Sequence, residues 1–245
     1  MKRLLAITAL LVLIPAGSFA QQLPDFLSQV PAGGSVASWI IRMFGLLTIL
    51  SVAPGILIMV TSFPRFVIAF SILRSGMGLA TTPSNMILVS LALFMTFYVM
   101  SPVFDKSWQE GIQPMLDNKI TETEAWPKIY SPFRDFMTAN TRDKDIKLFV
   151  DIAKERGQTT ETDGKLDLRV VVPAFMISEI RRGFEIGFLV VLPFLVIDLI
   201  VATITMAMGM MMLPPTSISL PFKILFFVLI DGWNLLVGSL TRSFV

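Results

Sequence analysis

The sequence predicts an all-α integral membrane protein. Hydrophobic residues make up 54% of its 245 positions and its mean hydropathy is +0.73, well above the range of soluble domains. Four apolar segments are each near the length of a helix that crosses a bilayer, and several contain a proline or a charge. Interrupted helices at membrane depth need protein or a cavity around them, so we expect broken hairpin helices within an oligomer.

Residues 1–20 have the pattern of a secretory signal peptide. Lys2 and Arg3 form a basic start, residues 4–14 are apolar, and Ser18-Phe19-Ala20 is a small-x-small cleavage site. The apolar core is too short to span a bilayer, so we predict that the segment is cleaved. An uncleaved N-terminal anchor is the alternative.

Residues 21–104 are predicted to hold N-terminal helices and a first hydrophobic hairpin. Its two spans are Met43 to Val60 and Met86 to Phe104. Pro54-Gly55 interrupts the first span and is expected to break it.

The loop between these spans contains basic residues and no acidic one. Arg65 and Arg74 are its two charges, which indicates a cytoplasmic loop under the positive-inside rule. We therefore interpret both arginines as topology signals. The following region, residues 105–172, is then predicted to be periplasmic and helical.

The periplasmic region carries two helix signals. Residues 143–157 have an amphipathic stripe that ends at Gly157, and Thr121-x-x-Glu124 is a capping box. The helix after Glu124 is expected to be short or broken, because Pro127 and Pro132 follow.

Two further expectations concern the end of this region. Residues 158–165 are polar and are predicted to be a flexible loop, and Pro173 suits the first turn of the next helix.

Residues 173–245 are predicted to form a second hydrophobic hairpin with a methionine-rich loop. Its spans are Gly187 to Leu213, in which Pro193 is expected to break the helix, and Ile224 to Leu240. Small residues that permit close helix approach or tight bends are Gly76, Gly78, Gly183 and Gly187.

Charges in and beside the second hairpin are predicted to be buried against protein. They are Glu185, Asp198 and Asp231. Asp198 and Asp231 lie in different spans, so a proton or small-solute channel and an intramembrane aspartic protease are both alternatives. Neither aspartate stands in a Gly-x-Gly-Asp motif, which favours a structural role over catalysis.

Glu179 and Lys223 flank the same hairpin and have opposite charges. Hydropathy places them on opposite faces of the membrane, so a direct pair would require a contact between neighbouring copies. Separate, solvated positions are the alternative.

The run Met206-Ala-Met208-Gly-Met210-Met211-Met212 is rich in a flexible, polarizable side chain. A ring of such residues from several copies would close a pore and yield to a passing chain. Ordinary apolar filling of a membrane helix is the alternative. Gly209 would permit a bend.

Composition excludes several kinds of site. The chain has no Cys and no His, which removes disulfides and zinc sites built from these ligands. A formal net charge of +2 gives little support for nucleic-acid binding. It also lacks a Gly-x-x-x-x-Gly-Lys phosphate loop. We predict a non-enzyme without metal or cofactor.

Three long strings resemble the FliP/SctR family of type III secretion export-gate proteins. They are residues 61–78, TSFPRFVIAFSILRSGMG; residues 173–188, PAFMISEIRRGFEIGF; and residues 210–215, MMMLPP, continued by 219–233, SLPFKILFFVLIDGW. The resemblance covers most of residues 40–245. The N-terminal signal and the sizeable outer region are similar to the flagellar branch.

This resemblance implies a core subunit of the flagellar export gate, which passes unfolded rod, hook and filament proteins. It implies a helical, ring-like homo-oligomer, expected to be a pentamer, with FliQ and FliR, and with the FlhA and FlhB components as further partners. The implied location is the inner membrane, in the flagellar basal body. The implied pore gasket is Met208, Met210, Met211 and Met212, and the implied interchain charge contacts are Glu179 and Lys223.

Overall fold

The computed structural model describes residues 36–162, 164–210 and 214–244, so the predicted signal peptide lies outside the described residues. These residues are mostly helical, which confirms the predicted class. The elements are α3 (Val36–Met59), α4 (Phe63–Gly76), α5 (Asn85–Ser107), the π-helix η1 (Trp108–Ile112), α6 (Gln113–Leu116), α7 (Glu122–Asn140), α8 (Asp143–Glu155), β1 (Glu161–Thr162), β2 (Lys165–Leu166), α9 (Leu168–Ala207), α10 (Pro215–Leu229) and α11 (Gly232–Arg242).

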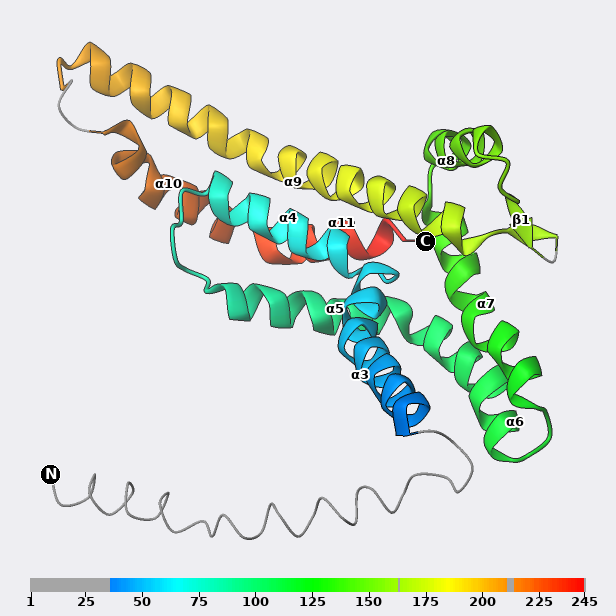
Figure 1. The fold of residues 1–245 in the computed structure, drawn as a ribbon. Coiled ribbons are helices and arrows are strands. Elements are labelled where there is room, and N and C mark those ends of the chain that lie inside the picture. The colour runs from blue at the N-terminus through cyan, green and yellow to red at the C-terminus, as the bar shows by residue number, and fades with distance from the viewer. Residues whose placement is uncertain (1–35, 163, 211–213, 245) are drawn as a thin grey trace, which may run out of the picture. The chain divides into compact units, whose positions relative to one another are not determined.

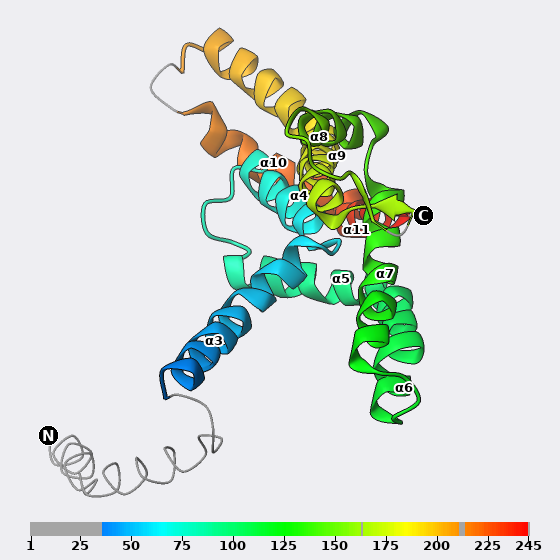
Figure 2. The same cartoon turned by 45° about the vertical axis from the view of Figure 1, so that its right-hand side comes forward.

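The described residues fall into two compact units, which are divided after Pro54. In the second unit, α4 packs along α9, and α10 and α11 return beside the same helix (Figure 1). Figure 2 shows α8 beside the N-terminal part of α9, and α7 antiparallel to the end of α5. The main apolar core therefore lies between α4, α5, α9, α10 and α11.

Glycines set the distance between α4 and α9, as the sequence predicted. A Cβ atom on Gly76 would overlap Val191, and one on Gly183 would lie 3.0 Å from Ile68. Gly187 faces Ile72 in the same way, and Gly78 has a φ of +79° in the turn after α4. The small residues thus allow the two backbones to approach closely.

Two described helices are long and apolar enough to cross a membrane. They are the continuous stretch Asn85–Leu116 and α9. The predicted first span, Met43 to Val60, lies mostly within α3, where the stretch Met43–Ile56 is an apolar helix shorter than the roughly 20 residues that a span requires. By length and composition, the described residues therefore contain two such helices, or three spans if the bent pair of α10 and α11 counts as one, where the sequence predicts four.

The bent pair corrects the predicted fourth span. The chain turns by 63° between α10 and α11. Asp231, expected inside a span, has a φ of +51° and caps the start of α11, two residues after α10 ends at Leu229. Aspartate is one of the few residues that adopt this left-handed conformation readily.

Prolines do not break the helices where the sequence predicted. Pro54 lies within α3, Pro193 within the 40-residue α9, and Pro127 and Pro132 within the 19-residue α7. Each removes one backbone hydrogen bond. For α7 and α9, packing against neighbouring helices outweighs that loss.

The outer region confirms some local signals and corrects others. Thr121 and Glu124 form the predicted capping box. As predicted, α8 ends just before Gly157, which has a φ of +64°. The predicted loop at residues 158–165 instead contributes β1 and β2, an antiparallel hairpin whose turn holds Gly164 at a φ of +69°.

The start of α9 also differs from the prediction. It begins five residues before Pro173, because the carboxylate of Asp167 caps the helix by accepting a hydrogen bond from the Arg169 amide at 2.8 Å.

Candidate functional site

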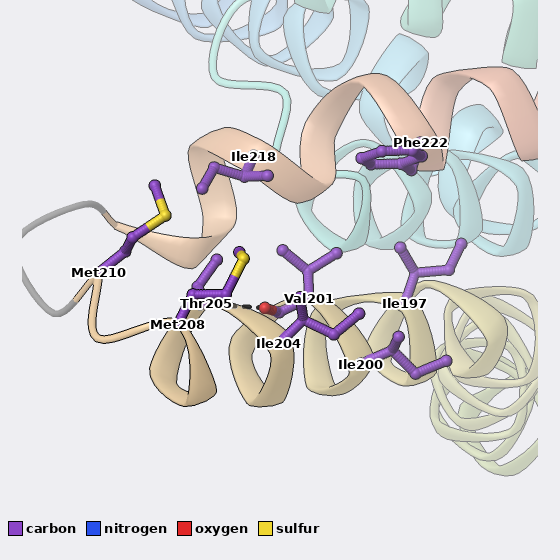
Figure 3. Close-up of a pocket in the computed structure, with 9 residues that line it drawn as sticks. All are labelled: Ile197, Ile200, Val201, Ile204, Thr205, Met208, Met210, Ile218 and Phe222. Carbon is purple, nitrogen blue, oxygen red and sulfur yellow. Dashed lines mark hydrogen bonds between the residues drawn. The ribbon is translucent and has the colours of Figure 1, made fainter.

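An apolar pocket of about 480 Å³ lies between the last turns of α9 and the start of α10. In Figure 3, Ile218 and Phe222 of α10 face the side chains of α9, and Met208 and Met210 lie at the loop end. Thr205 is the polar residue of this lining, and its hydroxyl donates to a carbonyl of its own helix at 3.0 Å. The other lining residues are Ile197, Ile200, Val201 and Ile204.

The methionine-rich loop begins with a tight turn. Gly209 has a φ of +74°, and the amide of Met210 donates to the Thr205 carbonyl at 3.0 Å, as in a glycine-terminated helix. This confirms the predicted bend. Met208 and Met210 are 60% and 39% exposed, so both can meet another surface.

The rest of the predicted gasket, Met211 and Met212, lies outside the described residues. Closure of a pore by methionines from several copies stays a prediction.

Lys223 lies at the centre of a polar network beneath this pocket. Its side chain is nearly inaccessible, and Nζ lies 2.6 Å from Oδ2 of Asp198 and 3.2 Å from the Gly76 carbonyl oxygen. The buried hydroxyl of Ser219 donates to the other oxygen of Asp198. The network links α4, α9 and α10, and it compensates the charge of a lysine that burial would otherwise penalise.

A second network surrounds Arg65 and Glu179, both fully buried. Arg65 Nε donates to Glu179 Oε2 at 2.9 Å, and Nη2 donates to Oε1. Arg65 Nη1 donates to the carbonyl and hydroxyl oxygens of Ser243 at 2.9 and 2.6 Å. The guanidinium also lies 3.5 Å from the ring centroid of Phe244, a cation–π distance. We call these four residues the Arg65 cluster.

The Arg65 cluster corrects the interpretation of Arg65 and bears on the predicted contact between Glu179 and Lys223. Arg65 was interpreted as a topology signal, but its charge is used inside the fold. Sequence reasoning also missed Ser243 and Phe244. Within the described chain, Glu179 pairs with Arg65 and Lys223 pairs with Asp198. Their contact across neighbouring copies, which a single chain does not contain, stays a prediction.

The charges predicted to be buried differ in their surroundings. Asp198 is half-buried in the Lys223 network, whereas Asp231 is exposed at the junction of α10 and α11. The side chain of Glu185 is 54% exposed and pairs with Arg181 on the preceding turn of α9. Burial of Glu185 or Asp231 would therefore require a surface from another copy or another protein.

A third polar cluster attaches α8 to α9. Ser178 donates to the buried carboxylate of Asp145 and accepts from the Arg142 amide at 3.1 Å. The Arg142 side chain also donates to Asp145, from Nε at 2.9 Å. Burial acts to raise the pKa of Asp145, but the hydrogen bonds from Ser178 and Arg142 outweigh it and hold the pKa below its ordinary value.

No group of three or more acidic side chains in the described part of the chain is placed to hold a metal ion. The geometry instead offers an apolar pocket beside a methionine loop, with the Lys223 network next to it and the Arg65 cluster as a separate site.

Comparison with known proteins identifies the family. A sequence model described as the FliP family matches residues 46–240. The chain belongs to the FliP family. It is 75% identical over 244 residues to "Flagellar biosynthetic protein FliP" of Agrobacterium fabrum, covering 100% of both chains. It is 78% identical over 226 residues to the protein of that name from Rhizobium meliloti, covering 92% of each.

A more distant FliP relative also matches over most of its length. The Bacillus subtilis protein is 48% identical over 204 residues, which cover 83% of this chain and 91% of the relative. The matched region of the family model contains all residues of the pocket, the Lys223 network and the Arg65–Glu179 pair.

The Arg65 cluster predicts an asymmetric result from single and double substitutions. Glu179→Ala should lower the free energy of unfolding by about 3–5 kcal/mol, because it leaves a buried guanidinium without a counter-charge. The double variant Arg65→Met/Glu179→Leu should lose less free energy of unfolding than Glu179→Ala, since neither buried charge remains. Denaturant unfolding of the purified chain in detergent measures both. Glu185→Ala, which breaks an exposed pair, serves as control and should change stability by at most about 1 kcal/mol. An equal loss of unfolding free energy in all three variants would contradict the assignment of Arg65 and Glu179 as a buried ion pair.

The Asp145 cluster predicts a pH dependence. Because the pKa of Asp145 is lowered by folding, its stabilising contribution is complete above the unfolded pKa of about 3.9 and is lost as pH falls through the folded value. Hydrogen exchange of α8 should therefore rise sharply only below about pH 4. In Asp145→Asn, hydrogen exchange of α8 should already be fast at neutral pH. Asp143→Asn, a substitution at a solvent-exposed position, should exchange like the wild type. An unchanged α8 in Asp145→Asn would refute the role of the cluster.

Proposed function

We propose that this chain is a non-enzymatic core subunit of the flagellar type III protein export gate. In this role it forms part of the channel through which unfolded rod, hook and filament proteins cross the inner membrane. Membership of the FliP family carries the proposal, because the relatives that match along nearly their whole length are named flagellar biosynthetic proteins.

The chemistry of the second hairpin supports this function. A conduit for many unfolded sequences needs a surface that accepts different side chains, and exposed Met208 and Met210 beside an apolar pocket supply an adaptable one. We propose that Met208, Met210, Met211 and Met212 of several copies form the closed seal. Energy for transport would come from other components.

The proposal includes an assembly. Exposed apolar side chains are numerous along α5, α9 and α10, more than a soluble monomer would show. We propose that copies of this chain, as a pentamer, together with FliQ and FliR cover part of this surface, with FlhA and FlhB as further components and lipid over the rest.

Among the described residues, the surroundings of Asp198 and Asp231 do not favour the alternative channel or the protease. Asp198 is bonded to Lys223 and Ser219, while Asp231 lies exposed at a helix junction. The two carboxylates do not share a hydrogen bond among the interactions of the described residues.

Deletion of the chain tests the export role directly. Hook and filament proteins should disappear from the culture medium while their cytoplasmic levels stay normal, and the intact chain should restore export. Immunoblots of medium and cell fractions measure this. Normal export by the deletion strain would refute the proposal.

The seal is tested by replacing Met208, Met210, Met211 and Met212 together with alanine. Shorter side chains should leave a gap in the closed pore, so ion leakage across the membrane should rise while the assembled complex persists. Met206→Ala is the matched control, because Met206 is similarly exposed but outside the predicted seal. Ion permeability equal to that of the control would contradict the gasket role.

A further inference from the structure

A second apolar pocket, of about 270 Å³, lies where α4 ends and α5 begins. The chain between these helices forms one wall, and α10 and the start of α11 form the other. The apolar residues that line it are Phe70, Leu73, Met77, Leu79, Pro83, Leu88, Ile224, Phe227, Val228 and Trp233. The pocket is separate from the one beside the methionine loop and shares no lining residue with it.

One cation lines this apolar pocket. Arg74 is half-buried, and its Nη1 donates to the Asn85 side chain and, at 3.4 Å, to the Pro83 carbonyl. Both acceptors are neutral. Across residues 36–162, 164–210 and 214–244, the ion pairs of the structure do not include Arg74. Its positive charge is therefore available to an anion from outside the chain.

The neighbouring basic residues, unlike Arg74, are paired with carboxylates. Lys223 is close to the same turn, but its ammonium contacts the Asp198 carboxylate at 2.6 Å. Arg65, at the other end of α4, is bonded to Glu179. The residues between Arg65 and Asn85 include no Asp or Glu. The charge at the pocket is thus that of Arg74 alone.

The position of Arg74 relative to the membrane is set by its bond to Asn85. Asn85 is the first residue of the stretch Asn85–Leu116, which is long and apolar enough to span a bilayer. The end of such a span lies at the level of the lipid headgroups, where arginine commonly meets phosphate. Val228 in the lining of the pocket is 69% exposed, and Met86 at the start of the stretch is 80% exposed, as expected for a surface in contact with acyl chains.

We propose that this pocket binds an anionic phospholipid. The phosphate contacts the Arg74 guanidinium, which suits phosphate oxygens through paired donors, and part of one acyl chain occupies the apolar pocket against Trp233. The charge complementarity and the apolar lining together fit a lipid rather than a water-soluble anion. This site does not depend on what the channel transports.

Trp233 provides the readout, because bromine atoms on an acyl chain quench tryptophan fluorescence at contact. The full-length chain, with Trp39, Trp108 and Trp126 replaced by phenylalanine, is titrated in detergent with brominated phosphatidylglycerol or brominated phosphatidylcholine. Half-maximal quenching should need about fivefold less phosphatidylglycerol, the ratio that corresponds to about 1 kcal/mol for one basic residue at an anionic membrane surface. No quenching, or equal quenching by both lipids, would overturn the proposal.

Substitutions separate this site from a general attraction to anionic lipid. Arg74→Gln should bring the two lipids to equal potency, Arg74→Lys should keep most of the preference, and the exposed control Lys119→Gln should keep all of it. A preference that survives Arg74→Gln would refute the role of Arg74. Glycerol 3-phosphate at the concentration of the lipid should not relieve the quenching; relief would show a site for free phosphate and contradict a lipid.

Discussion

The guanidinium group of Arg65 has no contact with water, and the structure around it depends on how its charge is met. Glu179 supplies the counter-charge from α9, and Ser243 supplies two further acceptors just after α11. Because an unpaired buried charge would be very unfavourable, α4, α9 and the segment after α11 must come together for any of them to be stable there. The close contact of α4 and α9 through Gly183 lies directly beside this pair.

Buried polar and charged side chains recur at intervals along α9 and hold different elements against it. Ser178 binds α8 through Asp145, Glu179 binds α4, and Asp198 binds α10 through Lys223. Each contact is directional, unlike the apolar packing around it. In a protein whose surface is largely apolar on several sides, such contacts fix the register of the helices where hydrophobicity alone would permit sliding.

Much of the secondary structure could be predicted, because its signals are local. The capping box at Thr121 and the amphipathic stripe of α8 need only neighbouring residues, and both are present. Pro193 and Pro132 misled the prediction, since tertiary packing preserved helices that an isolated peptide would interrupt. The bend at Asp231 was missed for the opposite reason: a backbone φ of +51° at an aspartate leaves little trace in hydropathy.

The candidate site could also be predicted only where its signals are local. Gly209 marked the turn before the methionine loop, but the partner of Arg65 lies 114 residues away and could not be read from spacing. One signal was available: Arg65 stands alone between Phe63-Pro64 and Phe66-Val67, in a setting too apolar for a solvated loop.

The Arg65 cluster also constrains the order in which the protein can be made. Ser243 follows Arg65 by 178 residues, so the ribosome adds its two acceptor groups long after it has added Arg65. Throughout that interval a charged side chain within an apolar helix has to be kept away from lipid by water, by the insertion machinery or by a temporary partner. The Arg65 cluster is consequently complete only after residues 243 and 244 have been synthesised and have reached α4.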